Sequence, residues 1–285
     1  MEIYLGKSSG FCFGVKNAID GTEKILKESN ENIYCLGEII HNEDVIKTLE
    51  EKGLIFIDDI NQAHGTTIIR THGVPKEIYQ IANEKKIKII DYTCPFVLKI
   101  HEEVSRYSQN NYFIFLLGIK KHPETIGTKS FCGNNSYIIE NLDDIEQAIN
   151  TFNSSELNKL LIISQTTFSI SLFKNIVDVV TNKLNPSINL EIKNTICNTT
   201  SIRQKETEEL SKEVDFMIII GGKNSSNTKK LYEIAEKNCS KHLLIQTAND
   251  LQNIDFSTTK KIGIMAGAST PENTINDVVN FCKKL

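Results

Sequence analysis

The sequence has no excess of positive charge and no long apolar run, and each absence excludes a class of function. It contains 32 Lys and Arg against 36 Asp and Glu, which gives a net charge of -4. Proteins that bind nucleic acid or membrane surfaces usually carry a basic patch, so no nucleic acid is expected as a partner. The longest apolar runs, residues 113–119 and 216–220, are far too short to span a bilayer. No membrane association is predicted either.

The sequence also lacks a Cys-x-x-Cys pair and the signature of a secreted protein. Its seven cysteines are an odd number, which argues against a complete disulfide framework. The first residues show no basic stretch followed by an apolar one, as a signal peptide would. We therefore expect a cytoplasmic protein. In that reducing compartment cysteines serve as core residues, metal ligands or nucleophiles.

Apolar runs rich in β-branched residues alternate with amphipathic helical patterns along the whole chain. This alternation is typical of an α/β fold with mostly parallel sheets. Strands are expected at residues 33–36, 54–57, 67–70, 87–91, 112–117, 160–163, 216–220, 243–245 and 261–265. Helices are expected at residues 17–29, 75–86, 95–109, 169–184, 227–238 and 271–285.

Three cysteines share a local pattern that divides the chain into thirds. Cys12, Cys94 and Cys197 each stand where an extended segment gives way to a helix. A polar turn follows each at nearly the same distance: His41 after 29 residues, His122 after 28 and Ser225 after 28. A second turn follows at His72 after 60 residues, and at Thr166 and Ser269 after 72. The repetition predicts three small α/β domains at residues 1–94, 95–192 and 193–285.

The chemistry expected at these turns follows from the geometry of α/β sheets. Ligands bind at the carboxyl ends of the strands, so three sheets facing a common centre would bring the cysteines together. A helix N-terminus favours the thiolate form of cysteine. Three thiolate ligands are compatible with two kinds of metal site. One is a zinc site, although zinc prefers four ligands, and the other is a cubane iron–sulfur cluster, in which one iron would have a free coordination position. Cys132 is the only candidate fourth ligand, and Cys239 and Cys282 are expected in the core.

The remaining turns supply groups that suit a phosphate or diphosphate. They offer imidazoles, hydroxyls, a carboxamide and loop N–H groups. Glu124 is the only carboxylate among them, and burial beside an anion would raise its pKa, so it is interpreted as a proton donor. Taken singly, each of these residues also fits an ordinary turn or helix cap. Only the repeated spacing argues for a site, and three other histidines are interpreted as packing or surface residues: His64, His101 and His242.

Nine short motifs occur in the order found in one known family: GFCFGV, GEIIHN, RTHGVP, DYTCPFV, HPE, SQTTFS, NTICNTTSIRQ, GGKNSSNT and AGASTPE. On these motifs the chain resembles the LytB/IspH family of 4-hydroxy-3-methylbut-2-enyl diphosphate reductases over essentially its whole length. The resemblance implies an α/β trefoil of three pseudo-repeated domains around a central iron–sulfur cluster. It also implies the last step of the non-mevalonate (MEP) isoprenoid pathway, the reductive dehydroxylation of an allylic diphosphate to isopentenyl and dimethylallyl diphosphate.

The resemblance further implies roles for the matching positions. Cys12, Cys94 and Cys197 would bind one 4Fe-4S cluster with one open iron, and Glu124 would donate the proton. The allylic diphosphate would be bound by His41, His72, His122, Thr166, Ser225, Ser226, Asn227 and Ser269. A ferredoxin or flavodoxin would supply the electrons. The sequence departs from the family pattern at Phe13, Tyr92 and Asn198, beside the three cysteines, and in the stretch after Glu124.

Two other functions fit the same three cysteines. An iron–sulfur-dependent dehydratase or synthase would use the open iron to remove a hydroxyl without net reduction, so its product would form without an electron donor. A non-catalytic iron–sulfur sensor would need a surface for its partner, and the chain has neither a basic tail nor an appended domain.

Overall fold

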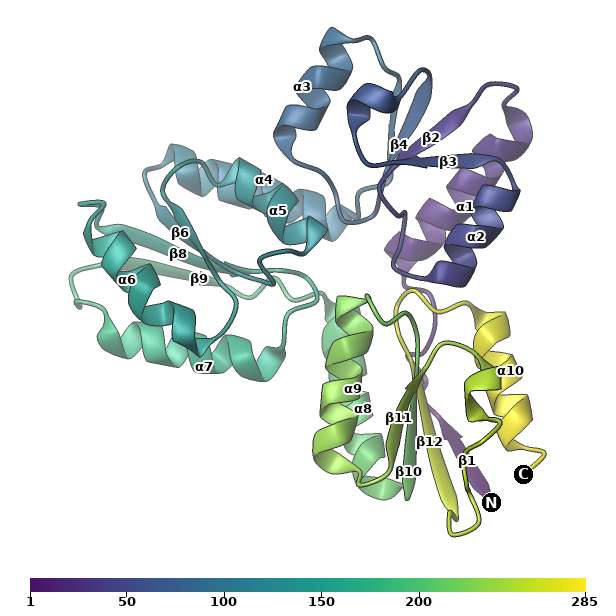
Figure 1. Cartoon of the computed structure of the whole chain (residues 1–285). Coiled ribbons are helices and arrows are strands. Elements are labelled where there is room, and N and C mark those ends of the chain that lie inside the picture. Colours follow the sequence, from purple (N-terminus) through teal and green to yellow (C-terminus); the bar gives the residue numbers. More distant parts are fainter. The chain divides into compact units, whose positions relative to one another are not determined.

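The computed structural model describes residues 1–285, which form three separate four-stranded sheets whose strands all pair in parallel. Helices join the strands, so the predicted α/β class is confirmed (Figure 1). None of the helices is both long and apolar enough to cross a lipid bilayer. The trefoil arrangement around a cluster stays a prediction.

The three sheets repeat one strand order, and we number them along the chain. Sheet 1 has the order β3-β2-β4-β5, sheet 2 the order β7-β6-β8-β9 and sheet 3 the order β11-β10-β12-β1. The bounds in sheet 1 are β2 (Ile33–Leu36), β3 (Leu54–Ile57), β4 (Thr66–Ile69) and β5 (Ile89–Asp91). Those in sheet 2 are β6 (Phe113–Leu117), β7 (Ser136–Ile139), β8 (Lys159–Ser164) and β9 (Asn189–Lys193). Those in sheet 3 are β10 (Phe216–Ile220), β11 (His242–Ile245), β12 (Lys261–Ala266) and β1 (Glu2–Leu5).

The connecting helices alternate with these strands along the chain. The α-helices are α1 (Phe13–Glu28), α2 (Glu43–Glu51), α3 (Lys76–Glu84), α4 (Pro95–Gln109), α5 (Pro123–Phe131), α6 (Ile145–Asn153), α7 (Ile170–Lys183), α8 (Asn198–Glu213), α9 (Ser226–Asn238) and α10 (Glu272–Cys282). Short 3-10 helices are η1 (Ile60–Gln62), η2 (Leu142–Asp144) and η3 (Ala248–Leu251).

The chain forms two compact units. The N/C unit comprises residues 1–23, 38–53 and 198–285 and holds sheet 3; the central unit comprises residues 24–37 and 54–197 and holds sheets 1 and 2. Figure 1 shows purple β1 beside yellow β12, because the first strand pairs with the last one. The predicted boundary after residue 94 lies between β5 and α4, the one after residue 192 lies inside β9, and β1 belongs to the sheet of the last third. The division into three domains stays a prediction.

Alternating side chains bury both faces of the central strands. In β6, Phe113, Phe115 and Leu117 pack on one face with residues of α6 and α7. Ile114 and Leu116 pack on the other with residues of α4. Side chains of a strand point alternately to opposite faces, so an unbroken apolar run is what a doubly covered parallel strand needs. Each such side chain stabilises the fold by about 1.5–3 kcal/mol, and the sheets are thereby rigid supports for the loops at their ends.

Candidate active site

The three predicted cysteines follow the same strand of the three sheets. Cys94 comes after β5, Cys197 after β9 and Cys12 after β1, each the edge strand that ends its sheet's order. Each cysteine directly precedes a helix, which begins at Pro95, Asn198 and Phe13 respectively. The structure thus places all three thiols at the carboxyl ends of parallel strands, beside a helix N-terminus.

The same backbone hydrogen bond recurs at each cysteine. The N–H of Cys12 donates to the carbonyl of Ala268 at 3.2 Å, that of Cys94 to Thr71 at 2.9 Å, and that of Cys197 to Thr166 at 2.9 Å. The acceptors lie in the loops after β12, β4 and β8, which are the neighbouring strands. Each cysteine is therefore tied to a loop that carries a predicted substrate residue: Ser269, His72 and Thr166.

The seven cysteines divide into two chemical groups, and none forms a disulfide. Cys12, Cys94 and Cys197 are partly exposed. Burial raises the pKa of Cys35 and Cys132 to about 12 and that of Cys282 to about 11, and it also raises the pKa of Cys239. Those four are thiols at neutral pH. Metal ions bind the thiolate form of cysteine, and the three partly exposed cysteines at helix starts are the ones that solvent and a metal can reach.

Cys132, the candidate fourth ligand, lies in the core of the central unit. It is fully buried beside Ile114, Leu116 and Leu161. Its thiol donates to the carbonyl of Thr128 at 3.4 Å. This environment supports its interpretation as a core residue, in line with Cys239 and Cys282, which also pack in apolar clusters.

Glu124 and Thr166 form a buried pair in the central unit. Glu124 lies at the start of α5 and is 2% exposed. Its carboxylate accepts the backbone N–H of Thr166 at 2.7 Å and the hydroxyl of Thr166 at 2.7 Å. Burial raises the pKa of Glu124 to about 7, although the two bonds from Thr166 act to lower it. The carboxyl group can therefore hold a proton near neutral pH.

Two predicted histidines lie beside this pair in the central unit. His122 caps α5, and its Nδ1 accepts the backbone N–H of Glu124 at 3.2 Å, which fixes Nε2 as the ring's protonated nitrogen. The rings of His72 and His122 meet edge to face with centroids 5.3 Å apart. The imidazoles, Glu124 and the cysteine loop of Cys197 therefore share one edge of the central unit.

The N/C unit carries a second polar cluster, at the start of α9. Ser225 caps the helix and accepts the N–H of Thr228 at 3.3 Å. Ser226 and Asn227 are buried in its first turn. Both polar atoms of the Asn227 carboxamide are buried without a hydrogen-bond partner. A carboxamide with unused hydrogen-bonding capacity at a helix N-terminus can donate to an anionic ligand through its NH2 group.

The loops of Ser269 and His41 pack on this cluster within the N/C unit. The Ser269 hydroxyl donates to the His41 carbonyl at 3.4 Å, and the Asn42 side chain donates to the Ser269 carbonyl at 2.9 Å. A Cβ on Gly222 would lie 2.3 Å from the His41 carbonyl oxygen, so only glycine allows this approach. The His41 Nδ1 lies 2.9 Å from the Glu38 carboxylate.

Some residues of these loops were not singled out from the sequence. The Gln165 side chain accepts the N–H of Ile119 at 3.1 Å and donates to the Thr167 hydroxyl at 2.8 Å, so it joins the loops after β6 and β8. Thr270 donates to the Ile220 carbonyl at 3.0 Å and joins the loops after β10 and β12 in the same way. Their position beside the predicted Thr166 and Ser269 was the only sequence signal available.

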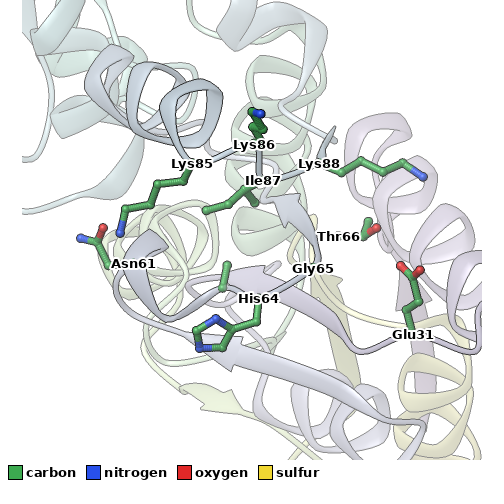
Figure 2. Close-up of a pocket in the computed structure, with 10 residues that line it drawn as sticks. Glu31, Asn61, His64, Gly65, Thr66, Lys85, Lys86, Ile87 and Lys88 are labelled. Atoms are coloured by element: carbon green, nitrogen blue, oxygen red, sulfur yellow. The ribbon is translucent and has the colours of Figure 1, made fainter.

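The three histidines that were interpreted as packing or surface residues are indeed packed against aromatic rings or exposed. His101 is buried and stacks on Phe131 with centroids 4.3 Å apart, and burial lowers its pKa to about 4. His242 packs edge to face on Tyr232. His64 is exposed and lines a cavity of about 560 Å³ with Lys85, Lys86 and Lys88 (Figure 2).

That cavity lies at the end of sheet 1 opposite to the end where Cys94 is found. Its lining residues precede β4 and β5 or begin them, so they mark the amino ends of the strands. In Figure 2 the lysine side chains extend outward around the hollow instead of converging on one point. Cys94 follows the opposite, carboxyl end of β5. The candidate site is therefore not this cavity.

Comparisons with known proteins support the family resemblance that the sequence motifs indicate. Residues 3–283 match the family model described as LytB protein. The 4-hydroxy-3-methylbut-2-enyl diphosphate reductase of Clostridioides difficile (strain 630) is 41% identical over 287 residues, which cover 100% of both chains. The enzyme of the same name from Aquifex aeolicus is 39% identical and covers 98% of this chain and 94% of its own.

A solved structure of E-1-hydroxy-2-methyl-but-2-enyl-4-diphosphate reductase from Plasmodium falciparum has a similar fold, with a TM-score of 0.89 and 35% identity. It covers 98% of this chain and 87% of that one. A second structure, of (E)-4-hydroxy-3-methyl-but-2-enyl diphosphate reductase, the terminal enzyme of the non-mevalonate pathway, has a TM-score of 0.71 and 38% identity over 100% of both chains.

Proposed function

The chain belongs to the LytB protein family, and on that premise we propose that it catalyses the reaction for which its relatives are named. It is an oxidoreductase that removes the allylic hydroxyl of 4-hydroxy-3-methylbut-2-enyl diphosphate, at the last step of the non-mevalonate isoprenoid pathway. Two electrons and two protons are consumed, the carbon–oxygen bond breaks and water leaves. The products are isopentenyl diphosphate and dimethylallyl diphosphate.

The observation that carries this proposal is the buried Glu124–Thr166 pair, tied by a backbone bond to the loop of Cys197. A reductive dehydroxylation needs an acid that is still protonated at neutral pH, and burial gives Glu124 that property. In its protonated form the Glu124 carboxyl group would donate to the Thr166 hydroxyl oxygen, and the Thr166 O–H would then be free to donate to the substrate. Glu124 is thus the proton donor and Thr166 the residue that orients it.

We assign the metal centre to Cys12, Cys94 and Cys197. The donor set fits an iron–sulfur cluster, because these three thiols are accessible at helix starts while the other four are buried. When bound, a 4Fe-4S cluster with three cysteine ligands would supply electrons one at a time and one iron with an open position. The helix N-termini beside the cysteines would stabilise its negative charge.

We propose that neutral donors bind the diphosphate, as the family resemblance implies. In the N/C unit the helix N-terminus of α9 offers Ser225, Ser226 and Asn227, with Ser269 and His41 in the adjoining loops. In the central unit His72 and His122 lie beside Glu124. Hydroxyl, carboxamide and imidazole donors bind an anion without adding positive charge. Anchoring the diphosphate would orient the substrate for the reaction.

We propose that the electrons come from a partner protein of the ferredoxin or flavodoxin type, since the reaction consumes two of them. We place the protein in the cytoplasm. Seven cysteines without a disulfide suit a reducing compartment, and a thiolate-bound cluster would need it.

The direct test is an anaerobic assay of the purified, cluster-loaded protein with the allylic diphosphate. Isopentenyl and dimethylallyl diphosphate should form only when a one-electron reductant is added. Product formed without any reductant would favour the dehydratase or synthase instead. No product, with no change in the protein's electron paramagnetic resonance signal on adding the diphosphate, would favour the sensor.

Replacing Asn227 by alanine should weaken binding of the diphosphate without destabilising the fold. The carboxamide has no partner in the fold, and an unsatisfied buried polar group costs stability, so Asn227→Ala should unfold at the same temperature or higher. The KM for the diphosphate should rise about 30-fold, the value of a hydrogen bond to a charged group. The control is Asn238→Ala at the other end of α9, which should leave KM unchanged. A KM for Asn227→Ala equal to that of the control would remove Asn227 from the site.

A further inference from the structure

The connection that leads to Cys12 differs from its two counterparts. It comprises residues 6–11, whereas residues 92–93 connect β5 to Cys94 and residues 194–196 connect β9 to Cys197. It also contains two glycines, and Gly10 has a φ of 99°, in the left-handed region. A longer segment with glycines loses more conformational freedom when it is ordered. Without added contacts Cys12 would be the least fixed of the three cysteines.

Two side chains of α8 fasten this connection. The Nε of Arg203 donates to the Ser8 carbonyl at 2.6 Å, and its Nη2 donates to the Gly10 carbonyl. Glu206 accepts the backbone N–H of Lys7 at 2.5 Å and that of Ser8 at 2.9 Å, and it also accepts the Ser8 hydroxyl. We call Arg203 and Glu206 the α8 clamp. Its bonds are charge-assisted and so are stronger than bonds between neutral groups.

The clamp pairs a buried arginine with a partly exposed glutamate. Arg203 is 2% exposed, and arginine is rarely so deeply buried without a specific role. Burial acts to raise the pKa of Glu206, but the hydrogen bonds from Ser8 and Lys7 outweigh it and hold that pKa below its usual value. Glu206 is therefore an anion at neutral pH, as its three acceptor bonds require.

The other side of the connection is held by the loop after β12. The Ser9 hydroxyl accepts the N–H of Ala266 at 3.0 Å, and the N–H of Cys12 donates to Ala268 at 3.2 Å. Residues 7–12 thus lie between α8 and the end of β12, within the N/C unit. Neither of the other two cysteines follows a segment held by a buried arginine.

We propose that Arg203 and Glu206 are positioning residues for Cys12, which hold its loop in the conformation that presents the thiol to the metal cluster. This inference rests on the proposed function, since it presupposes that Cys12 is a ligand. The helix that carries the clamp begins directly after Cys197. The same helix therefore follows one ligand along the chain and fixes the loop of another.

The test compares variants of the clamp in protein reconstituted anaerobically with iron and sulfide. Arg203→Met removes the donors and keeps the length of the side chain, Arg203→Lys restores one donor, and Lys205→Met alters an exposed neighbour on α8. A chelator should remove iron from Arg203→Met about tenfold faster than from the wild type, because both charge-assisted hydrogen bonds from Arg203 to the loop are lost. Arg203→Lys should lie between the two, and Lys205→Met should match the wild type.

Hydrogen exchange on the cluster-free proteins provides the second readout. In Arg203→Met the amides of residues 7–12 should exchange faster, while those of β10 and β12 should not. A wild-type rate of iron loss in Arg203→Met, or faster exchange spread over the whole of sheet 3, would overturn the positioning role. A wild type that takes up no iron would refute the proposed function, and the exchange measurement would still decide whether the clamp orders the loop.

Discussion

Glu124→Gln is expected to lower kcat about a thousandfold, within the range of a lost general acid. Glutamine has nearly the same shape, and it can still accept the backbone N–H of Thr166 that now reaches the carboxylate at 2.7 Å. It cannot release a proton. Substrate affinity and iron content should therefore stay close to those of the wild type. The measurement is steady-state turnover with a saturating artificial electron donor.

The pH dependence adds a second check on the same residue. Because the acid must carry a proton, and burial raises the pKa of Glu124 to about 7, wild-type kcat should fall as the pH rises through 7. This decrease in kcat as the pH rises through 7 should be absent from Glu124→Gln. The matched control is Glu146→Gln, an exposed carboxylate of α6, which should keep both kcat and the pH profile. Near-normal turnover in Glu124→Gln would show that another group donates the proton.

Cys94→Ser should abolish the cluster after anaerobic purification. The serine oxygen is a far weaker ligand for iron than a thiolate, so iron and sulfide content and the brown colour should be lost with all turnover. Cys132→Ser is the control, because a serine hydroxyl can also donate to the Thr128 carbonyl in that buried position. It should keep the cluster at some cost in stability. A stable cluster in Cys94→Ser together with its loss in Cys132→Ser would reverse the ligand assignment.

Every strand that lies inside a sheet is predicted from the sequence, and so are the edge strands β3, β5 and β11. β6 and β10 are fully buried runs of apolar residues, and their predicted bounds agree with the structure to within one residue. The missed strands are β1, β7 and β9, all at sheet edges. β9 (Asn189–Lys193) alternates polar and apolar residues and is mostly exposed, so no apolar run marks it. β1 is stabilised by its pairing with β12, a long-range contact that local patterns do not encode.

The candidate site residues could be proposed from the sequence because they stand at regular places in the fold. The cysteines follow the edge strands, and the polar turns follow the two central strands of each sheet. Spacing along the chain therefore reports position in the sheet. Glu206 and Arg203 carry no such signal, since they lie within a helix and act on a loop nearly two hundred residues away in sequence. The unpartnered carboxamide of Asn227 likewise becomes visible only in three dimensions.

The central claim is that three cysteines hold one cluster whose fourth iron is open to the substrate. Mössbauer spectroscopy of the anaerobic protein labelled with iron-57, with and without the allylic diphosphate, tests it most directly. We expect four iron sites per chain, with a change confined to one of them when the diphosphate is added. Four sites that are equivalent and unaffected by the diphosphate would contradict the claim.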